Sequence, residues 1–88
     1  MRLTLRIINE KGLHARASAR FVEVVERFAA EAQVTKDGMT VSGDSIMGLL
    51  MLAASKGTSI EVQTSGAEAG ALADALQALV ADQFGEDF

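Results

Sequence analysis

The spacing of apolar residues changes several times along this 88-residue chain, and the order of the changes constrains the fold more than any other feature. Apolar and polar residues alternate over residues 2–7, as in a strand with one buried face. Apolar residues then recur at helical spacing, which predicts a first helix ending at about Ala30. The turn signal Asp37-Gly38 between two short alternating segments predicts a β-hairpin.

The second half of the chain shows a similar change of period. Ser45 is placed to cap a short second helix, which Gly57 would close. Residues 59–64 alternate again and predict a fourth strand. Residues 65–68 have the spacing of a capping box, which predicts the start of a last helix.

These segments give the order β-α-β-β-α-β-α and predict a single α+β domain over residues 1–88. The expected architecture is an open-faced sandwich, a four-stranded antiparallel sheet with three helices on one face. A right-handed crossover would place the last strand between the two strands joined by the first helix. Residues 83–88 are expected to form a loose tail.

The predicted second helix is apolar on more sides than one sheet face can cover. One stripe is expected to lie in the core, and it consists of Ile46, Leu49, Leu50 and Ala53. Met47 and Met51 fall on another side of the helix. Methionine recurs on surfaces that accept several partners, so we expect Met47 to be partly exposed, although core packing is its commoner use.

Composition excludes several classes of site. The chain has no cysteine and one histidine, so neither a disulfide nor a metal site is expected. The longest apolar run, residues 46–54, is too short for a membrane span, and no secretory signal is visible. We therefore expect a soluble, cytoplasmic protein without a membrane or metal partner.

Charge is concentrated at the start of the chain. Residues 1–20 carry five basic groups and one acidic group, whereas the whole chain has a net charge of −4. This overall acidity, with few aromatic residues, argues against nucleic acid as a partner. A cationic end on an acidic body suits a small anion or an acidic protein surface.

The histidine, His14, lies within a Gly-Leu-His-Ala-Arg segment at residues 12–16, where the first helix is predicted to begin. A helix N-terminus attracts anions, and the N–H groups of Ala15 and Arg16 would face a bound anion there. Arg16 and Arg20 lie four residues apart on the same side. From the residues alone, an anion site and an ordinary loop histidine beside a solvated helix face both stay open.

The segment at residues 12–16 resembles the active-site motif of HPr, the histidine phosphocarrier family of the bacterial phosphoenolpyruvate-dependent phosphotransferase system. The Ser-Ile-Met-Gly segment at residues 45–48, followed by Lys56-Gly57, resembles the regulatory-serine segment of the same family. The similarity extends over residues 2–80. The family usually has proline where this chain has Ala17, and we expect a mild effect because alanine also favours a helix.

The resemblance implies that His14 accepts a phosphoryl group from phosphorylated enzyme I and passes it to an enzyme IIA protein. It implies that the Arg16 side chain and the N–H groups of Ala15 and Arg16 hold the phosphoryl oxygens. It also implies regulatory phosphorylation of Ser45 where a cognate serine kinase exists. No cofactor is implied, and the chain would act as a monomeric transfer component rather than an independent catalyst.

In HPr proteins the second helix flanks the active histidine and docks on partners, so Arg20, Met47 and Met51 are the expected docking residues. Two branches of the family, one in sugar uptake and one in nitrogen-related regulation, are compatible with the motifs. Residues 49–62 and the acidic tail look more like the nitrogen-related form.

One hypothesis of a different class remains. A small regulatory domain could bind an anionic ligand non-covalently through His14 and Arg16, without any phosphoryl transfer.

Overall fold

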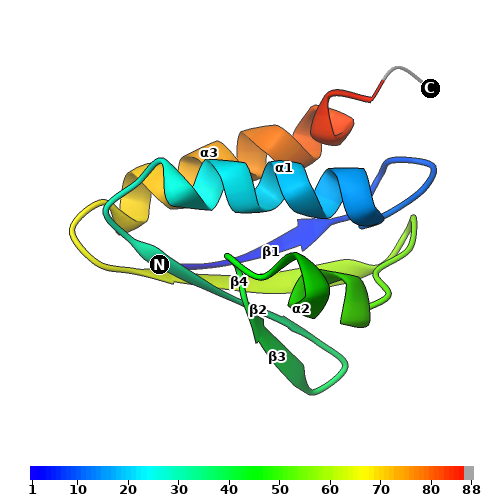
Figure 1. The fold of residues 1–88 in the computed structure, drawn as a ribbon, viewed down its shortest axis with the longest axis horizontal. Helices are drawn as coiled ribbons and strands as arrows, with labels where there is room; N and C mark the ends of the chain where they lie inside the picture. The colour runs from blue at the N-terminus through cyan, green and yellow to red at the C-terminus, as the bar shows by residue number, and fades with distance from the viewer. Residues whose placement is uncertain (87–88) are drawn as a thin grey trace.

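The computed structural model describes residues 1–86 and has its strands and helices in the predicted order (Figure 1). The elements are β1 (Arg2–Arg6), α1 (Ala15–Glu26), β2 (Glu31–Lys36), β3 (Met39–Ser42), α2 (Ile46–Met51), β4 (Ser59–Ser65), α3 (Ala69–Ala81) and the 3₁₀ turn η1 (Gln83–Gly85). The predicted β-α-β-β-α-β-α order and α+β class are therefore confirmed. No helix within residues 1–86 is both long and apolar enough to cross a bilayer.

The four strands form one antiparallel sheet in the order β1-β4-β2-β3. Val62 of β4 is paired with Leu3 on one side and with Val34 on the other. The last strand has thus been inserted between β1 and β2, as the crossover rule predicts. As a result β1, which leads directly into the loop carrying His14, is held in the sheet by β4 alone.

The helices and the sheet share one core. Figure 1 shows α1 and α3 side by side over one face of the sheet, while the shorter α2 lies next to α1 and β3. Alternation along β4 leaves every second side chain buried and the others exposed, as in a sheet with one covered face. The fully buried core side chains include Ile7, Phe21, Val34, Leu49, Ile60, Val62, Leu72, Leu76 and Phe84.

Two local signals act as the sequence predicts. Asp37 and Gly38 both have left-handed backbone, with φ of +50° and +82°, which a two-residue hairpin turn of this type requires. The Ser45 hydroxyl accepts a hydrogen bond of 3.0 Å from the backbone N–H of Gly48 and so caps α2. The turn and the helix cap are each formed by a few consecutive residues, so the local sequence is enough to predict them.

Two predictions about the ends of helices are wrong. The first helix ends at Glu26 rather than at about Ala30. The capping box at residues 65–68 does not form, because the Glu68 carboxylate accepts a hydrogen bond of 2.7 Å from the N–H of Ala29 instead. That acid therefore joins the segment after α1 to the segment before α3, a contact across 39 positions of sequence.

The predicted core stripe of the second helix is largely wrong. Leu49 is fully buried, but Ile46 is 40% exposed and Ala53 is exposed. Ile46 lies at the first position of α2, and Leu50 is half-buried. Ala53 is exposed because α2 ends at Met51 rather than near Gly57, and Ala53 has left-handed backbone with φ of +51°. Helical spacing therefore does not apply beyond the end of α2, and Leu52 and Ala54 turn inward instead.

The loose tail predicted for residues 83–88 is wrong for its described part, residues 83–86, while residues 87 and 88 lie outside the described residues. Phe84 is fully buried in the core. The residues of η1 have left-handed backbone, with φ of +54°, +57° and +74° from Gln83 to Gly85. This bend returns the chain toward the loop between β1 and α1, and Figure 1 shows both segments at the same end of the molecule.

Candidate functional site

The loop before α1 is fixed by a close approach to the loop after α2. The N–H of Leu13 donates a hydrogen bond of 2.8 Å to the carbonyl of Ala54. Gly12 has φ of +65°, and a Cβ at this position would overlap that carbonyl and lie 2.9 Å from the Cα of Ser55. Glycine is therefore required both by the backbone angle and by the contact. The result is a rigid placement of the next residue but one, His14.

His14 occupies the N-cap position of α1. Its Nδ1 accepts a hydrogen bond of 3.3 Å from the backbone N–H of Arg16, and about a quarter of its side chain (27%) is exposed. A hydrogen bond accepted at Nδ1 requires a lone pair on that nitrogen, so the proton of the neutral ring belongs on Nε2. The unprotonated nitrogen thus lies at the positive end of the helix dipole.

The opposite edge of the ring faces a carboxylate. Nε2 of His14 is hydrogen bonded to Oε2 of Glu86, and the Glu86 side chain is only 2% exposed. The other carboxylate oxygen accepts a hydrogen bond of 2.6 Å from Nδ2 of Asn9, which also donates to the carbonyl of Gly12 at 2.8 Å. Asn9 itself is fully buried. One amide therefore connects the histidine loop with the tail.

Hydrogen bonding decides the charge state of Glu86. Burial acts to raise the pKa of this carboxyl, but hydrogen bonds from His14 and Asn9 and the nearby charges of His14 and Lys11 lower it more. Its pKa consequently lies below the ordinary value of 4.5, and the group is ionised at neutral pH.

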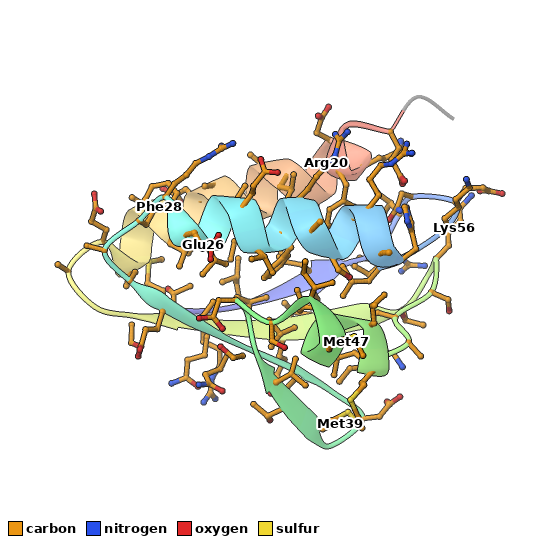
Figure 2. All side chains as sticks on the ribbon, viewed as in Figure 1. Arg20, Glu26, Phe28, Met39, Met47 and Lys56 are labelled. Atoms are coloured by element: carbon orange, nitrogen blue, oxygen red, sulfur yellow. The ribbon has the colours of Figure 1, made fainter. Side chains whose placement is uncertain are left out.

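The tail that supplies Glu86 is anchored at two further points. Phe84 is buried in the core, and its carbonyl accepts a hydrogen bond of 2.7 Å from Nη1 of Arg20. Figure 2 shows Arg20 on α1 extending toward this end of the molecule. Arg20, a predicted docking residue, is half-buried, and it holds the tail whatever else it contacts.

The other residues predicted for the site lie in the first turn of α1 and on α2. Ala15 and Arg16 are exposed in the first turn of α1. A shallow hollow of about 280 Å³ adjoins His14, and its walls are Lys11, Leu13, His14, Leu50, Ala53, Ala54 and Ser55. α2 therefore borders the histidine, while Ser45 caps the start of that helix.

The two methionines of α2 are exposed, Met47 at 69% and Met51 at 64%. Partial exposure of Met47 is therefore confirmed. Figure 2 shows Met47 on α2, the helix that contacts β3, on the side of the molecule away from α3. α2 itself reaches the hollow beside His14 through Leu50.

Residues 1–82 match the family model described as "PTS HPr component phosphorylation site". The chain belongs to the HPr family. It is 48% identical over 86 residues to the phosphocarrier protein HPr of Neisseria meningitidis serogroup A, an alignment that covers 98% of this chain and 97% of its relative.

Solved HPr structures agree in fold. The HPr-C-His structure from Thermoanaerobacter tengcongensis superposes with a TM-score of 0.94 at 34% identity, covering 100% of this chain and 99% of the other. HPr of Bacillus anthracis superposes with a TM-score of 0.86 at 38% identity, covering 91% and 95%. The four-stranded sheet and its helices are therefore the HPr fold, and the chain is a phosphoryl carrier of the phosphotransferase system.

Membership of the HPr family places the partners within the same system, among proteins such as enzyme I and the enzyme IIA proteins. Within residues 1–86, no group of three histidine, cysteine or acidic side chains could hold a metal ion. The site is thus one imidazole, a helix N-terminus, a buried carboxylate and exposed arginine.

Sequence reasoning missed two residues of this site, Asn9 and Glu86. Neither belongs to a periodic segment or to a motif, and Glu86 is 72 positions away from His14 in the chain. One signal could have indicated an ordered tail. Leu76, Val80 and Phe84 are four residues apart, so the apolar stripe of α3 continues to Phe84.

Proposed function

We propose that His14 is the residue that carries the phosphoryl group, and that Nδ1 is the atom that takes it. The observation that supports this proposal is the division of the ring, with Nδ1 at the helix N-terminus and Nε2 at the Glu86 carboxylate. The lone pair needed for nucleophilic attack is therefore on the side of the ring where an anion is favoured.

In the transfer step, the Nδ1 lone pair attacks phosphorus and forms the N–P bond. The bond from phosphorus to the donor atom breaks, and its electron pair returns to the donor. Nε2 keeps its proton throughout, so no proton has to leave the ring. The reverse sequence delivers the phosphoryl group to the acceptor, which requires that this end of α1 hold the group only moderately.

The N-terminal turn of α1 would hold the phosphoryl oxygens. The backbone N–H of Ala15 lies in the first turn, where N–H groups have no backbone partner within the helix. The N–H of Arg16 donates to Nδ1 of His14 at 3.3 Å, and it would be released to a phosphoryl oxygen when Nδ1 forms the N–P bond. The exposed guanidinium of Arg16 adds a planar, charge-assisted contact. The phosphoryl group would therefore be held by two kinds of donor, the backbone N–H groups of the first turn and the guanidinium of Arg16.

For partners, we infer phosphorylated enzyme I as the donor and an enzyme IIA protein as the acceptor, meeting a monomeric carrier in the cytoplasm. The docking surface would consist of Met47, Met51 and the part of Arg20 left accessible. The residues of α2 and of the segment after it favour the nitrogen-related branch, so a regulatory enzyme IIA is the inferred acceptor. Ser45 is proposed as a phosphorylation site where a cognate serine kinase exists.

The alternative function, non-covalent binding of an anionic ligand at His14 and Arg16, predicts a different chemical outcome. A reversible ligand leaves no adduct after denaturation, whereas a phosphohistidine does. The two functions are therefore separated by one labelling experiment.

That experiment incubates the protein with phosphoenolpyruvate and enzyme I. The expected product is one acid-labile, alkali-stable phosphoryl group per chain, absent from the His14→Ala variant. His14 is a half-buried N-cap residue outside the core, so this variant should keep the circular dichroism spectrum of the wild-type protein. An adduct that survives in the alanine variant, or none in the wild-type protein, would overturn the assignment.

A further inference from the structure

We propose that Glu86 is a positioning residue for phosphoryl transfer, which holds the proton of the neutral His14 ring on Nε2 and keeps Nδ1 as the nucleophile. This inference rests on the proposed function of His14. It assigns a role to a residue of the tail that contacts neither the phosphoryl group nor the reacting nitrogen.

The contact is specific on both partners. Nε2 of His14 meets Oε2 of Glu86, while Oε1 of Glu86 is occupied by Nδ2 of Asn9 at 2.6 Å. With the Glu86 side chain 2% exposed, water has little access to compete for either oxygen. Both carboxylate oxygens thus accept hydrogen bonds from the histidine loop.

The tail is built to deliver this carboxylate. Gln83 and Phe84 have left-handed backbone, a conformation that non-glycine residues rarely adopt. Burial of Phe84 and the hydrogen bond from Arg20 to its carbonyl hold the tail there. A Cβ at Gly85 would overlap the Arg20 guanidinium, so the chain passes directly against that side chain. A chance contact of an unanchored tail would need none of these features.

The chemistry follows from the placement. As Nδ1 bonds to phosphorus, the ring gains positive charge, which is shared with Nε2–H and faces the Glu86 carboxylate. Carboxylates that accept from the second nitrogen of a reactive or metal-bound histidine fix its tautomer and orientation in the same way. The nearby charge of Lys11 is cationic, and the carboxylate of Glu86 is the anionic group hydrogen bonded to the edge of the ring that carries the new charge.

A competing role would be that of a lid, in which the tail obstructs the histidine and must leave before transfer. The two roles predict opposite rates. Removing a positioning carboxylate slows transfer, and removing a lid accelerates it. Because Glu86 contacts Nε2 and leaves Nδ1 to the helix N-terminus, we expect the slower rate.

The first measurement is a nitrogen-15 and proton NMR spectrum of the unphosphorylated protein at a pH where the ring is neutral. The chain has one histidine, so every imidazole signal in the spectrum belongs to His14. The wild-type protein should show a downfield proton on Nε2 and an unprotonated Nδ1. Glu86→Ala should lose the downfield proton because alanine offers no acceptor to Nε2. Glu86→Gln should lose it because the amide has one oxygen and must turn its N–H groups toward either Asn9 or the ring. Glu86→Asp, which keeps the charge, should restore part of it.

The second measurement is the rate of phosphoryl transfer from phosphorylated enzyme I. Glu86→Ala should lower it about 10–100-fold, the range found when the carboxylate partner of a metal-binding histidine is removed. Asp82→Asn removes an exposed acid from the same tail and should change neither the spectrum nor the rate. Circular dichroism and thermal unfolding establish whether each variant is folded. If Glu86→Ala is unfolded, the rate of Glu86→Gln is compared with that of the wild-type protein instead.

An unchanged spectrum and rate in both neutral variants, or faster transfer, would overturn the role of Glu86. Every Glu86 variant should still form the adduct on His14, only more slowly. Loss of His14 as the acceptor would appear instead in the His14→Ala labelling experiment, so the two failures are distinguishable.

Discussion

The backbone N–H of Leu13 donates to the carbonyl of Ala54 at 2.8 Å, so the loop that carries the histidine is fastened to the loop that ends α2. This contact exists because Gly12 lets the two backbones approach. It makes the position of the His14 ring depend on a residue without a side chain.

Gly12→Ala should therefore destabilise the protein and displace His14. The left-handed backbone alone costs an alanine roughly 1–2 kcal/mol, and overlap with the Ala54 carbonyl adds to it. Gly38→Ala is the matched control, because Gly38 has φ of +82° but no atom within 4 Å of the added Cβ. Urea unfolding should show a larger loss of unfolding free energy for Gly12→Ala than for Gly38→Ala. Equal losses would mean that the loop shifts to relieve the overlap with the Ala54 carbonyl.

Arg16→Ala should slow phosphoryl transfer about 10-fold or more, the effect of losing a charge-assisted contact of roughly 1.5–3 kcal/mol. Arg27→Ala, at the C-cap of the same helix, is the control, since the Arg27 side chain is exposed and within the described residues pairs only at 3.5 Å with Glu23. Rapid mixing of each variant with phosphorylated enzyme I measures the two transfer rates. Similar small changes in the two variants would assign Arg16 to the solvated face.

Met47→Asp should weaken binding to both enzyme I and the acceptor while leaving the melting temperature nearly unchanged. The side chain is 69% exposed, so the charge disturbs a partner contact rather than the core. Leu49→Asp, two residues along α2 at a fully buried position, should unfold the domain. Titration calorimetry and thermal unfolding give the two quantities, and a large fall in melting temperature for Met47→Asp would contradict the docking role.

Phosphorylation of Ser45 should weaken binding to enzyme I without destabilising the fold. The phosphate adds about −1.5 to −2 charges at a helix N-terminus, where the dipole is positive, and it places a dianion two residues from Met47. Ser45→Ala should instead lose the capping bond to Gly48 and about 0.5–2 kcal/mol of stability. Unchanged transfer after complete modification would leave Ser45 as a helix cap alone.

The pH dependence of unfolding should reveal the Glu86 contact. Its pKa is lowered by folding, so its contribution to stability is complete above the ordinary pKa of 4.5 and is lost as the pH falls through the lower folded value. The wild-type protein should therefore exceed Glu86→Gln in unfolding free energy at neutral pH and lose this advantage below 4.5. A difference that stays constant across that range would mean that the carboxylate charge is not involved.

What the sequence predicts here depends on how far apart the interacting residues are. The Ser45 cap and the Asp37-Gly38 turn are formed by neighbours, and the position of β4 follows from a handedness rule. The core stripe assigned to α2 fails at Ala53 because that residue leaves helical backbone, which no spacing rule anticipates.

The Glu86 contact could not be read from the chain at all. It joins residues 72 positions apart, and a single acid near a chain end carries no periodic or motif signal. Family resemblance did not supply it either, since the similarity identified from sequence ends near Val80.

The central position of β4 also sets the order in which the molecule can assemble. On the ribosome, β1 emerges before the other strands of this sheet, but β4, its partner strand among the described residues, is not made until residues 59–65. Among the strands, only the β2–β3 hairpin can pair from local sequence, because the other two pairings close long loops and are expected to form late. Glu86 is synthesised later still. The loop that carries His14 is thus translated well before β4 and the tail, the two segments on which the placement of β1 and of the His14 ring depends.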